Sequence, residues 1–165
     1  HAIAGCLAAM PASSLIFAPF ANSYDRLVDG AHAPTAATWG YDNRTVAIRI
    51  PGGLNGARRI EHRTAGGDIN PYLLLSVILG AAMIGIKDEL EPSEPIVGNA
   101  YDVEDLPRLA ADWTAATDMF ASDPLISRIF DPMLIGNLVR CKRQEIEKFE
   151  QMHASAHWRA LLERV

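Results

Sequence analysis

Five arginines and one glutamate are the side chains of this sequence whose types and spacing best suit chemistry. They are Arg26, Arg44, Arg49, Arg59, Arg63 and Glu61. The stretch ARRIEHR, residues 57 to 63, puts Glu61 two positions from Arg59 and two from Arg63. Because successive side chains of an extended segment point to opposite faces, we expect these three residues to share one face.

This combination of side chains favours phosphate chemistry. The arginine guanidinium is a planar fork that binds carboxylate and phosphate oxygens. A carboxylate among arginines is either a salt-bridge partner or a ligand for a hard divalent cation, which often bridges protein to substrate phosphates. Arginines with a metal-binding carboxylate are typical of phosphoryl transfer, because they neutralise phosphate charge. The alternative is a charged sheet face with ordinary ion pairs, since the sequence has no Walker-type glycine loop.

The composition indicates an ordinary globular domain. The chain has 165 residues, of which 49% are hydrophobic and 21% charged. The formal net charge of -5 argues against a nucleic-acid partner. Two widely separated cysteines, Cys6 and Cys141, predict reduced thiols in a cytoplasmic protein. The most apolar run, residues 72–86, is shorter than the about 20 residues of a membrane span, so we expect no membrane partner.

The first half of the chain predicts one helix and three short strands. The helix covers residues 2–10 and ends at Pro11. The strand segments are 35–40, 44–50 and 57–63. A YDN turn after the first strand and a glycine-rich loop, GGLNG, before the third favour an antiparallel meander.

The second half predicts helices. Asn70, Asp123 and Asp131 each precede a proline, which is the N-cap pattern of a helix. We expect long helices over 71–87, 107–122 and 132–153 and a short one over 156–165. Helix 71–87 is apolar nearly all round, so we expect it to be central. The predicted fold class is α+β, with a short antiparallel meander followed by a mainly helical carboxy-terminal half.

Four motifs occur in an order that resembles a known family. They are NSYDRL, NRTVAIRIP, RRIEHR and GGDINPYL. In this order they resemble the carboxy-terminal part of the glutamine synthetase catalytic domain, most strongly between Asn22 and Leu90. The chain starts at His1, within an alanine-rich apolar stretch and without an initiator methionine. We therefore expect residues 1–165 to be one carboxy-terminal fragment of such a domain.

The resemblance implies a reaction and its cofactors. In this family ATP phosphorylates the side-chain carboxylate of glutamate, and an amine or ammonia then displaces phosphate from the γ-glutamyl phosphate. The family uses Mg²⁺ or Mn²⁺ to hold the phosphates. It forms double-ring homo-oligomers with active sites between subunits, so the resemblance implies this assembly for the parent protein. The fragment lacks the upstream part of the pattern, so we expect it to be inactive alone.

The resemblance also implies roles for individual residues. By motif position, Arg26 and Arg63 correspond to glutamate-binding residues. Arg44 corresponds to a catalytic arginine near the transferring phosphoryl group and, with Arg49, to the ATP-binding residues. Glu61 corresponds to a metal-binding glutamate. These correspondences explain why a strand would carry Glu61 beside Arg63, since the metal and the bound amino acid would then be neighbours.

Departures from the family pattern bear on the amine that is used. His32 stands in an acceptor loop where ammonia-using members carry a glutamate, and Gly56 replaces an ATP-contacting lysine. His32 is either a base or an exposed loop residue. With the motifs TWGYDNRT and EHR, these changes resemble the branch that joins glutamate to putrescine or another polyamine. Ammonia-using glutamine synthetase and a non-catalytic structural subunit are the alternatives.

A tyrosine in the acidic connector also matches a family position. Tyr101 falls where some bacterial members carry a tyrosine that is adenylylated. Its flanking residues differ from theirs, so an ordinary loop tyrosine is the alternative reading.

Overall fold

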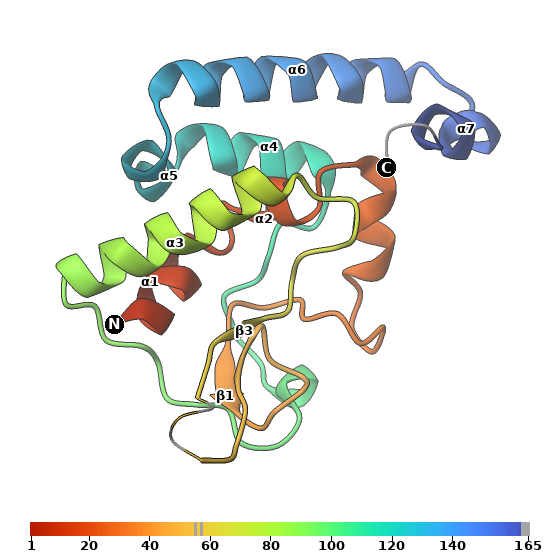
Figure 1. The fold of residues 1–165 in the computed structure, drawn as a ribbon. Coiled ribbons are helices and arrows are strands. Elements are labelled where there is room, and N and C mark those ends of the chain that lie inside the picture. Colours follow the sequence, from red (N-terminus) through yellow and green to blue (C-terminus); the bar gives the residue numbers. More distant parts are fainter. Residues whose placement is uncertain (55, 57, 163–165) are drawn as a thin grey trace.

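The computed structural model describes residues 1–54, 56 and 58–162, and it confirms an α+β fold. Helices form most of the molecule, and a small sheet with long loops lies at one end (Figure 1). The elements in chain order are α1 (Ala2–Ala9), α2 (Ser14–Phe17), the 3₁₀ turn η1 (Ala21–Arg26), β1 (Trp39–Tyr41), β2 (Ile48–Ile50), β3 (Glu61–His62), α3 (Pro71–Lys87), η3 (Ala100–Asp102), α4 (Trp113–Ser122), α5 (Pro124–Ile129), α6 (Pro132–Glu150), η4 (Ala154–Ala156) and α7 (His157–Leu161). The predicted last helix extended to 163–165, which lie outside the described residues.

The predicted helix starts at Asn70, Asp123 and Asp131 are confirmed. The Asn70 side chain accepts the N–H groups of Tyr72 and Leu73, and the two aspartates cap α5 and α6 in the same way. These caps satisfy N–H groups that have no partner within the helix. The proline that follows each cap lacks the N–H that would be unpaired there.

Helix α4 starts later than predicted. It begins at Trp113 rather than near residue 107, because the Asp112 side chain caps it by accepting the Ala115 N–H at 2.7 Å. The segment before it is extended and bonded to an earlier part of the chain. Ala37 donates its N–H to the Pro107 carbonyl, and Leu109 donates to Thr35. This pairing also explains why the first strand begins only at Trp39.

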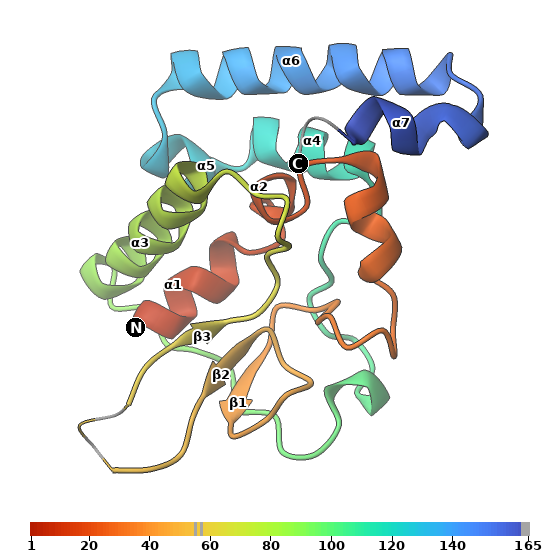
Figure 2. The same cartoon turned by 45° about the vertical axis from the view of Figure 1, so that its right-hand side comes forward.

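The sheet has the order β1-β2-β3, and its topology differs in part from the predicted meander (Figure 2). β2 and β3 are antiparallel as expected, but β1 and β2 are parallel. The YDN residues do not form a hairpin, because the Asn43 amide donates to the Ile96 and Gly98 carbonyls at 3.0 and 2.7 Å. Between Tyr41 and Ile48 the chain therefore runs back to the start of β1, and β2 then runs parallel to β1.

Helices α1 and α3 pack at very close range. A Cβ atom on Gly5 would collide with the Ala81 carbonyl, and one on Gly85 with the His1 carbonyl. The Cys6 thiol lies in this contact and is bonded to the Ile78 carbonyl at 3.6 Å. Burial raises the pKa of Cys6 to about 11.

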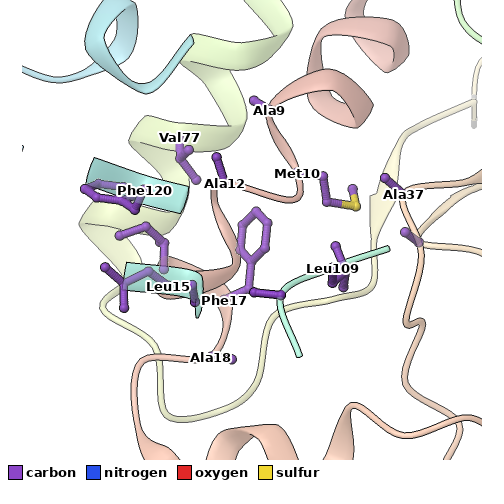
Figure 3. Close-up of a cluster of buried hydrophobic side chains, with 14 of the residues drawn as sticks. Ala9, Met10, Ala12, Leu15, Phe17, Ala18, Ala37, Val77, Leu109 and Phe120 are labelled. Atoms are coloured by element: carbon purple, nitrogen blue, oxygen red, sulfur yellow. The ribbon is translucent and has the colours of Figure 1, made fainter. Parts of the chain in front are cut away.

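The hydrophobic core lies where α1, α2, α3 and α4 meet. Leu15, Val77 and Phe120 are each about 1% exposed and come from three of these helices (Figure 3). The same buried cluster includes Met10 and, from the sheet, Ile48. Side chains from distant parts of the chain fill this core. Residues of the arginine-bearing strand, such as Ile48 and Ile50 of β2, belong to it, so this strand is fixed by close packing.

The composition of α3 predicted a central helix, but only one side of α3 is buried. Its inner face is buried against α1, but a stripe on its outer face is 51–81% exposed. This exposed stripe consists of Tyr72, Leu75, Leu79, Met83 and Ile86. The residues recur every three or four positions, so they lie on one side of the helix. In the part of the chain that the structure describes, no helix is long and apolar enough to span a membrane.

Candidate functional site

The centre of the candidate site is an ion pair between neighbouring strands. Arg49 of β2 and Glu61 of β3 are directly opposite in the antiparallel register. Arg49 Nη1 donates to Glu61 Oε2 at 2.9 Å. Residues opposite each other across two strands lie side by side, so the register itself produces this contact.

Glu61 is held by a second arginine on its other oxygen. Arg59 Nη2 donates to Glu61 Oε1 at 2.7 Å, which confirms that these two residues share a face. The hydrogen bond from Arg49, more than that from Arg59, keeps the pKa of Glu61 below its usual value. Glu61 is therefore a half-buried carboxylate that stays ionised and has guanidinium groups on both sides.

Asp42 completes this cluster, and sequence reasoning missed it. Its Oδ1 accepts from Arg49 Nη2 at 3.0 Å and from the Gly52 N–H at 2.9 Å. The Gly52 bond, followed by the bond from Arg49, lowers the pKa of Asp42. An aspartate directly after a strand is a usable signal, but the YDN segment predicts a hairpin turn that has no role for Asp42 in a site. We call Asp42, Arg49, Glu61 and Arg59 the acid–arginine row.

Arg26 is bonded to residues outside the row. At the end of η1, it donates from Nη1 to the Thr64 carbonyl at 2.7 Å and from Nη2 to the Phe17 carbonyl at 2.8 Å. Burial lowers its pKa, although the nearby Asp68 carboxylate opposes this. Its Nε is buried, and no hydrogen-bond partner is found for it among the described residues. Arg26 thus ties two chain segments together in this structure.

The Arg63 guanidinium also bonds backbone carbonyls and not Glu61. Its Nη1 donates to the carbonyls of Arg44 and Val46, the latter at 3.0 Å. The Arg63 N–H still pairs with the Ala47 carbonyl at 2.9 Å, one position beyond β3, but the guanidinium extends to the loop before β2. The structure therefore pairs Glu61 with Arg49 and Arg59 and places Arg63 against the loop before β2.

Arg44 lies on that loop and is exposed. It lines a surface hollow of about 430 Å³ together with Tyr41, Asn43 and Ile96. The connector around Ile96 reaches this place because Asn43 is bonded to it. Arg44 therefore lies just before β2, while Arg49 of the acid–arginine row lies in it, and the Arg44 side chain lines a hollow on the protein surface.

The two histidines near the site differ in environment. His62 faces away from Glu61, as the alternation predicts, and its ring lies 4.6 Å from that of Phe17. Burial lowers the pKa of His62 to about 4. His32 is exposed on its loop and has a left-handed backbone with φ of 63°.

Two further sequence-predicted positions lie around these loops. The Tyr101 hydroxyl donates to the Ala33 carbonyl at 3.1 Å, which ties the acidic connector to the His32 loop. Apart from its chain neighbours, no atom of the described residues lies within 4 Å of the place where a Cβ atom on Gly56 would stand. The structure therefore brings Tyr101 beside the predicted acceptor loop.

The donor atoms fit a metal ion only in part. No group of three or more His, Cys, Asp and Glu side chains that could hold a metal is found among the described residues. Glu61 alone can offer an ionised oxygen from the predicted position. A cation that bridges substrate phosphates often uses only one or two protein carboxylates. Glu61 fits as one such ligand, while a metal cage made by this chain alone does not fit.

Comparison with known proteins gives consistent results. The model of the family described as "Glutamine synthetase, catalytic domain" matches residues 1–160. Two relatives are each 37% identical to this chain over 150 residues: gamma-glutamylethanolamide synthetase GlnA4 of Streptomyces coelicolor and gamma-glutamylputrescine synthetase PuuA of Escherichia coli. Each alignment covers 91% of this chain and 32% of the relative. The chain thus spans about a third of the length of these relatives.

A solved structure shares the fold. The ligand-free structure of GmaS superposes with a TM-score of 0.79 at 25% sequence identity. The match covers 98% of this chain and 37% of that one. The helices and the small sheet therefore form the same arrangement as one part of a longer protein.

Proposed function

The chain belongs to the glutamine synthetase family, and on this basis we propose that it is part of an ATP-dependent ligase that joins glutamate to an amine. The reaction proceeds through γ-glutamyl phosphate, which the amine attacks with release of phosphate. The observation that carries the proposal is the acid–arginine row, since an ionised carboxylate between guanidinium groups suits the handling of phosphate and its cation.

In this proposal, two arginines bind ATP and two others bind glutamate. Arg44 and Arg49 bind ATP phosphates, and Arg44 stabilises the charge on the transferring group. Arg26 and Arg63 bind the glutamate substrate, using guanidinium N–H groups beyond those that donate to carbonyls. The hydrogen bonds that hold Arg26 and Arg63 to backbone carbonyls support this role, because a donor that is already fixed loses little conformational freedom on binding.

Glu61 is the proposed ligand for Mg²⁺ or Mn²⁺ within this chain. When bound, the cation supplies charge neutralisation for the phosphates. Arg49 and Arg59 keep the carboxylate ionised and fix its orientation. Both arginines must then share Glu61 with the cation.

The proposed acceptor is a small organic amine, with putrescine or another polyamine favoured. The two reported relatives carry names of ethanolamide- and putrescine-forming synthetases. His32 supports a departure from ammonia, since an imidazole ring cannot supply the negative charge that attracts ammonium. Ammonia itself is the second candidate, and a non-catalytic subunit is the third.

The proposed activity requires protein segments in addition to the described residues. The described residues contain no group of three or more side chains that could hold a metal ion, and the stripe on α3 leaves five large apolar side chains exposed. Exposed apolar area of this kind indicates a surface that other protein covers. We therefore propose that these residues are inactive alone and act within a longer, cytoplasmic chain that forms a double-ring homo-oligomer.

Product formation tests the proposal. The full-length parent and the 165-residue chain are incubated with ATP, Mg²⁺, glutamate and one acceptor: putrescine, a longer polyamine, ethanolamine or ammonia. We expect ADP release and γ-glutamyl amide only with the parent, and a Glu61→Gln parent that loses at least about a hundredfold in rate. A parent that folds but makes no product with any acceptor would favour the non-catalytic alternative, and turnover by the 165 residues alone would refute the need for more polypeptide.

A further inference from the structure

Asp42 lies at the end of β1, where two donors converge on one of its oxygens. The donors are Nη2 of Arg49, at 3.0 Å, and the N–H of Gly52, at 2.9 Å. An arginine N–H and a glycine N–H directed at one point also form the usual surroundings of a phosphate oxygen. The Asp42 carboxylate thus lies where an external anion could bind.

The backbone is shaped around this contact. Asp42 has a φ of 45°, in the left-handed region that aspartate and asparagine tolerate better than most residues. A Cβ atom on Gly52 would collide with the Asp42 carboxylate. The contact therefore depends on the residue types at both positions, unlike an exposed ion pair between two flexible side chains.

The Arg49 guanidinium is divided between two carboxylates. Nη1 donates to Glu61, and Nη2 donates to Asp42. The Arg49 side chain is only 19% exposed, while Asp42 is 60% exposed. Asp42 is consequently the partner that can move into water and leave Nη2 to another anion.

We propose that Asp42 is an internal competitor at an anion site made by Arg49 Nη2 and the Gly52 N–H, whose external ligand is a polyphosphate oxygen. This inference rests on the proposed phosphate contact of Arg49. Asp42 holds the guanidinium in place while the site lacks nucleotide. It also disfavours weakly charged anions, because only a ligand with several charges and further contacts displaces the carboxylate readily.

The test measures binding of pyrophosphate and orthophosphate to the 165-residue chain at low salt by calorimetry. Asp42→Asn removes the charge but keeps an amide oxygen for Gly52 and the tolerance for a left-handed backbone. We expect it to bind pyrophosphate at least about fivefold more tightly than wild type and to discriminate less against orthophosphate. Arg49→Gln should abolish this binding in both backgrounds.

A matched control separates this effect from net charge. Asp118→Asn removes one negative charge from a second aspartate–arginine pair, Asp118 with Arg143 at 2.9 Å, in which both side chains are exposed. It should leave pyrophosphate affinity within about twofold of wild type, since screening weakens distant charges. A gain equal to that of Asp42→Asn would overturn the proposal.

The outcomes distinguish this inference from the proposed function. If Arg49→Gln binds pyrophosphate as wild type does, the phosphate role of Arg49 fails, and the inference fails with it. If Arg49→Gln weakens binding but Asp42→Asn does not tighten it, only the inference is overturned. If Asp42→Asn loses its native circular dichroism, Asp42→Gly takes its place, because glycine also tolerates the backbone. Loss of native structure in both variants would make Asp42 purely structural and overturn the proposal.

Discussion

Two pairs of arginines in this molecule are bonded in different ways. Arg26 and Arg63 donate to backbone carbonyls, whereas Arg49 and Arg59 donate to the carboxylate of Glu61. A carbonyl is neutral and fixed in the chain, so the first pair acts as structural ties. A carboxylate is charged, and its partners can exchange for a cation or a phosphate. We call these pairs the carbonyl-bound and the carboxylate-bound arginines.

The difference shows that clustering in sequence does not assign a common role. Arg59 and Arg63 are four residues apart, yet one is 59% exposed beside Glu61 and the other is bonded to the loop before β2. Stability should therefore depend mainly on the carbonyl-bound arginines. Sensitivity to ions should depend mainly on the carboxylate-bound arginines.

The largest stability effect is expected at Arg26. Arg26→Ala leaves the Phe17 and Thr64 carbonyls without their donor, and we expect a loss of about 2–4 kcal/mol in the free energy of unfolding. Urea unfolding at low and high salt measures this, and the loss should be nearly independent of salt. Arg140→Ala, at an exposed position of α6, is the control and should change stability by less than about 0.5 kcal/mol.

An acid effect should follow from His62, whose ring packs against Phe17, the residue whose carbonyl accepts from Arg26. Its pKa is about 4 in the folded chain and near 6.5 in the unfolded chain, because burial disfavours the charged ring. The unfolded state therefore binds more protons between these values, and stability falls as the pH drops from 6.5 to 4. The loss attributable to His62 is at most about 3 kcal/mol.

Unfolding titrations at several pH values measure the acid effect. His62→Gln and His62→Phe should both flatten the stability profile between pH 6.5 and 4, since neither side chain takes up a proton. A slope in this range that is unchanged in both variants would show that other groups cause the acid sensitivity.

A smaller effect, specific to ions, is expected at Glu61. Glu61→Gln leaves Arg49 and Arg59 without their shared carboxylate, so sulfate should bind and stabilise the folded chain. We expect sulfate, compared with chloride at equal ionic strength, to raise the unfolding temperature about 2–4 °C more in the variant than in wild type. Equal shifts in both proteins would contradict the assignment of exchangeable partners to this pair.

The smallest effect is expected at Arg59. Its pair with Glu61 is largely exposed, so Arg59→Ala should change the free energy of unfolding by less than about 0.5 kcal/mol. Urea unfolding measures the change, and added salt should reduce it further. A loss as large as that of Arg26→Ala would erase the distinction between the two pairs.

Local chemistry made much of the fold predictable. The α+β class and the helix starts at Asn70, Asp123 and Asp131 depend on caps and prolines that act within a few residues. The parallel pairing of β1 and β2 was not predictable in this way. It depends on bonds from Asn43 to the connector more than fifty residues later in the chain.

The candidate site was predictable in part for a similar reason. Alternation along an extended segment correctly paired Arg59 with Glu61 and turned His62 away. It did not predict that the Arg63 guanidinium would bond carbonyls of the loop before β2. Asp42 was missed because its role depends on Arg49 and Gly52, which meet it only after the sheet has formed. The functional roles of all these residues remain predictions.

The close contact of α1 and α3 buries a cysteine whose reactivity reports when these two helices separate. Cys141 is exposed on α6, whereas Cys6 is buried between the two helices with a strongly raised pKa. A thiol reagent at neutral pH should therefore modify Cys141 at once and Cys6 only when α1 moves away from α3. The second, slow phase of the reaction measures how often this helix pair separates, without any engineered label.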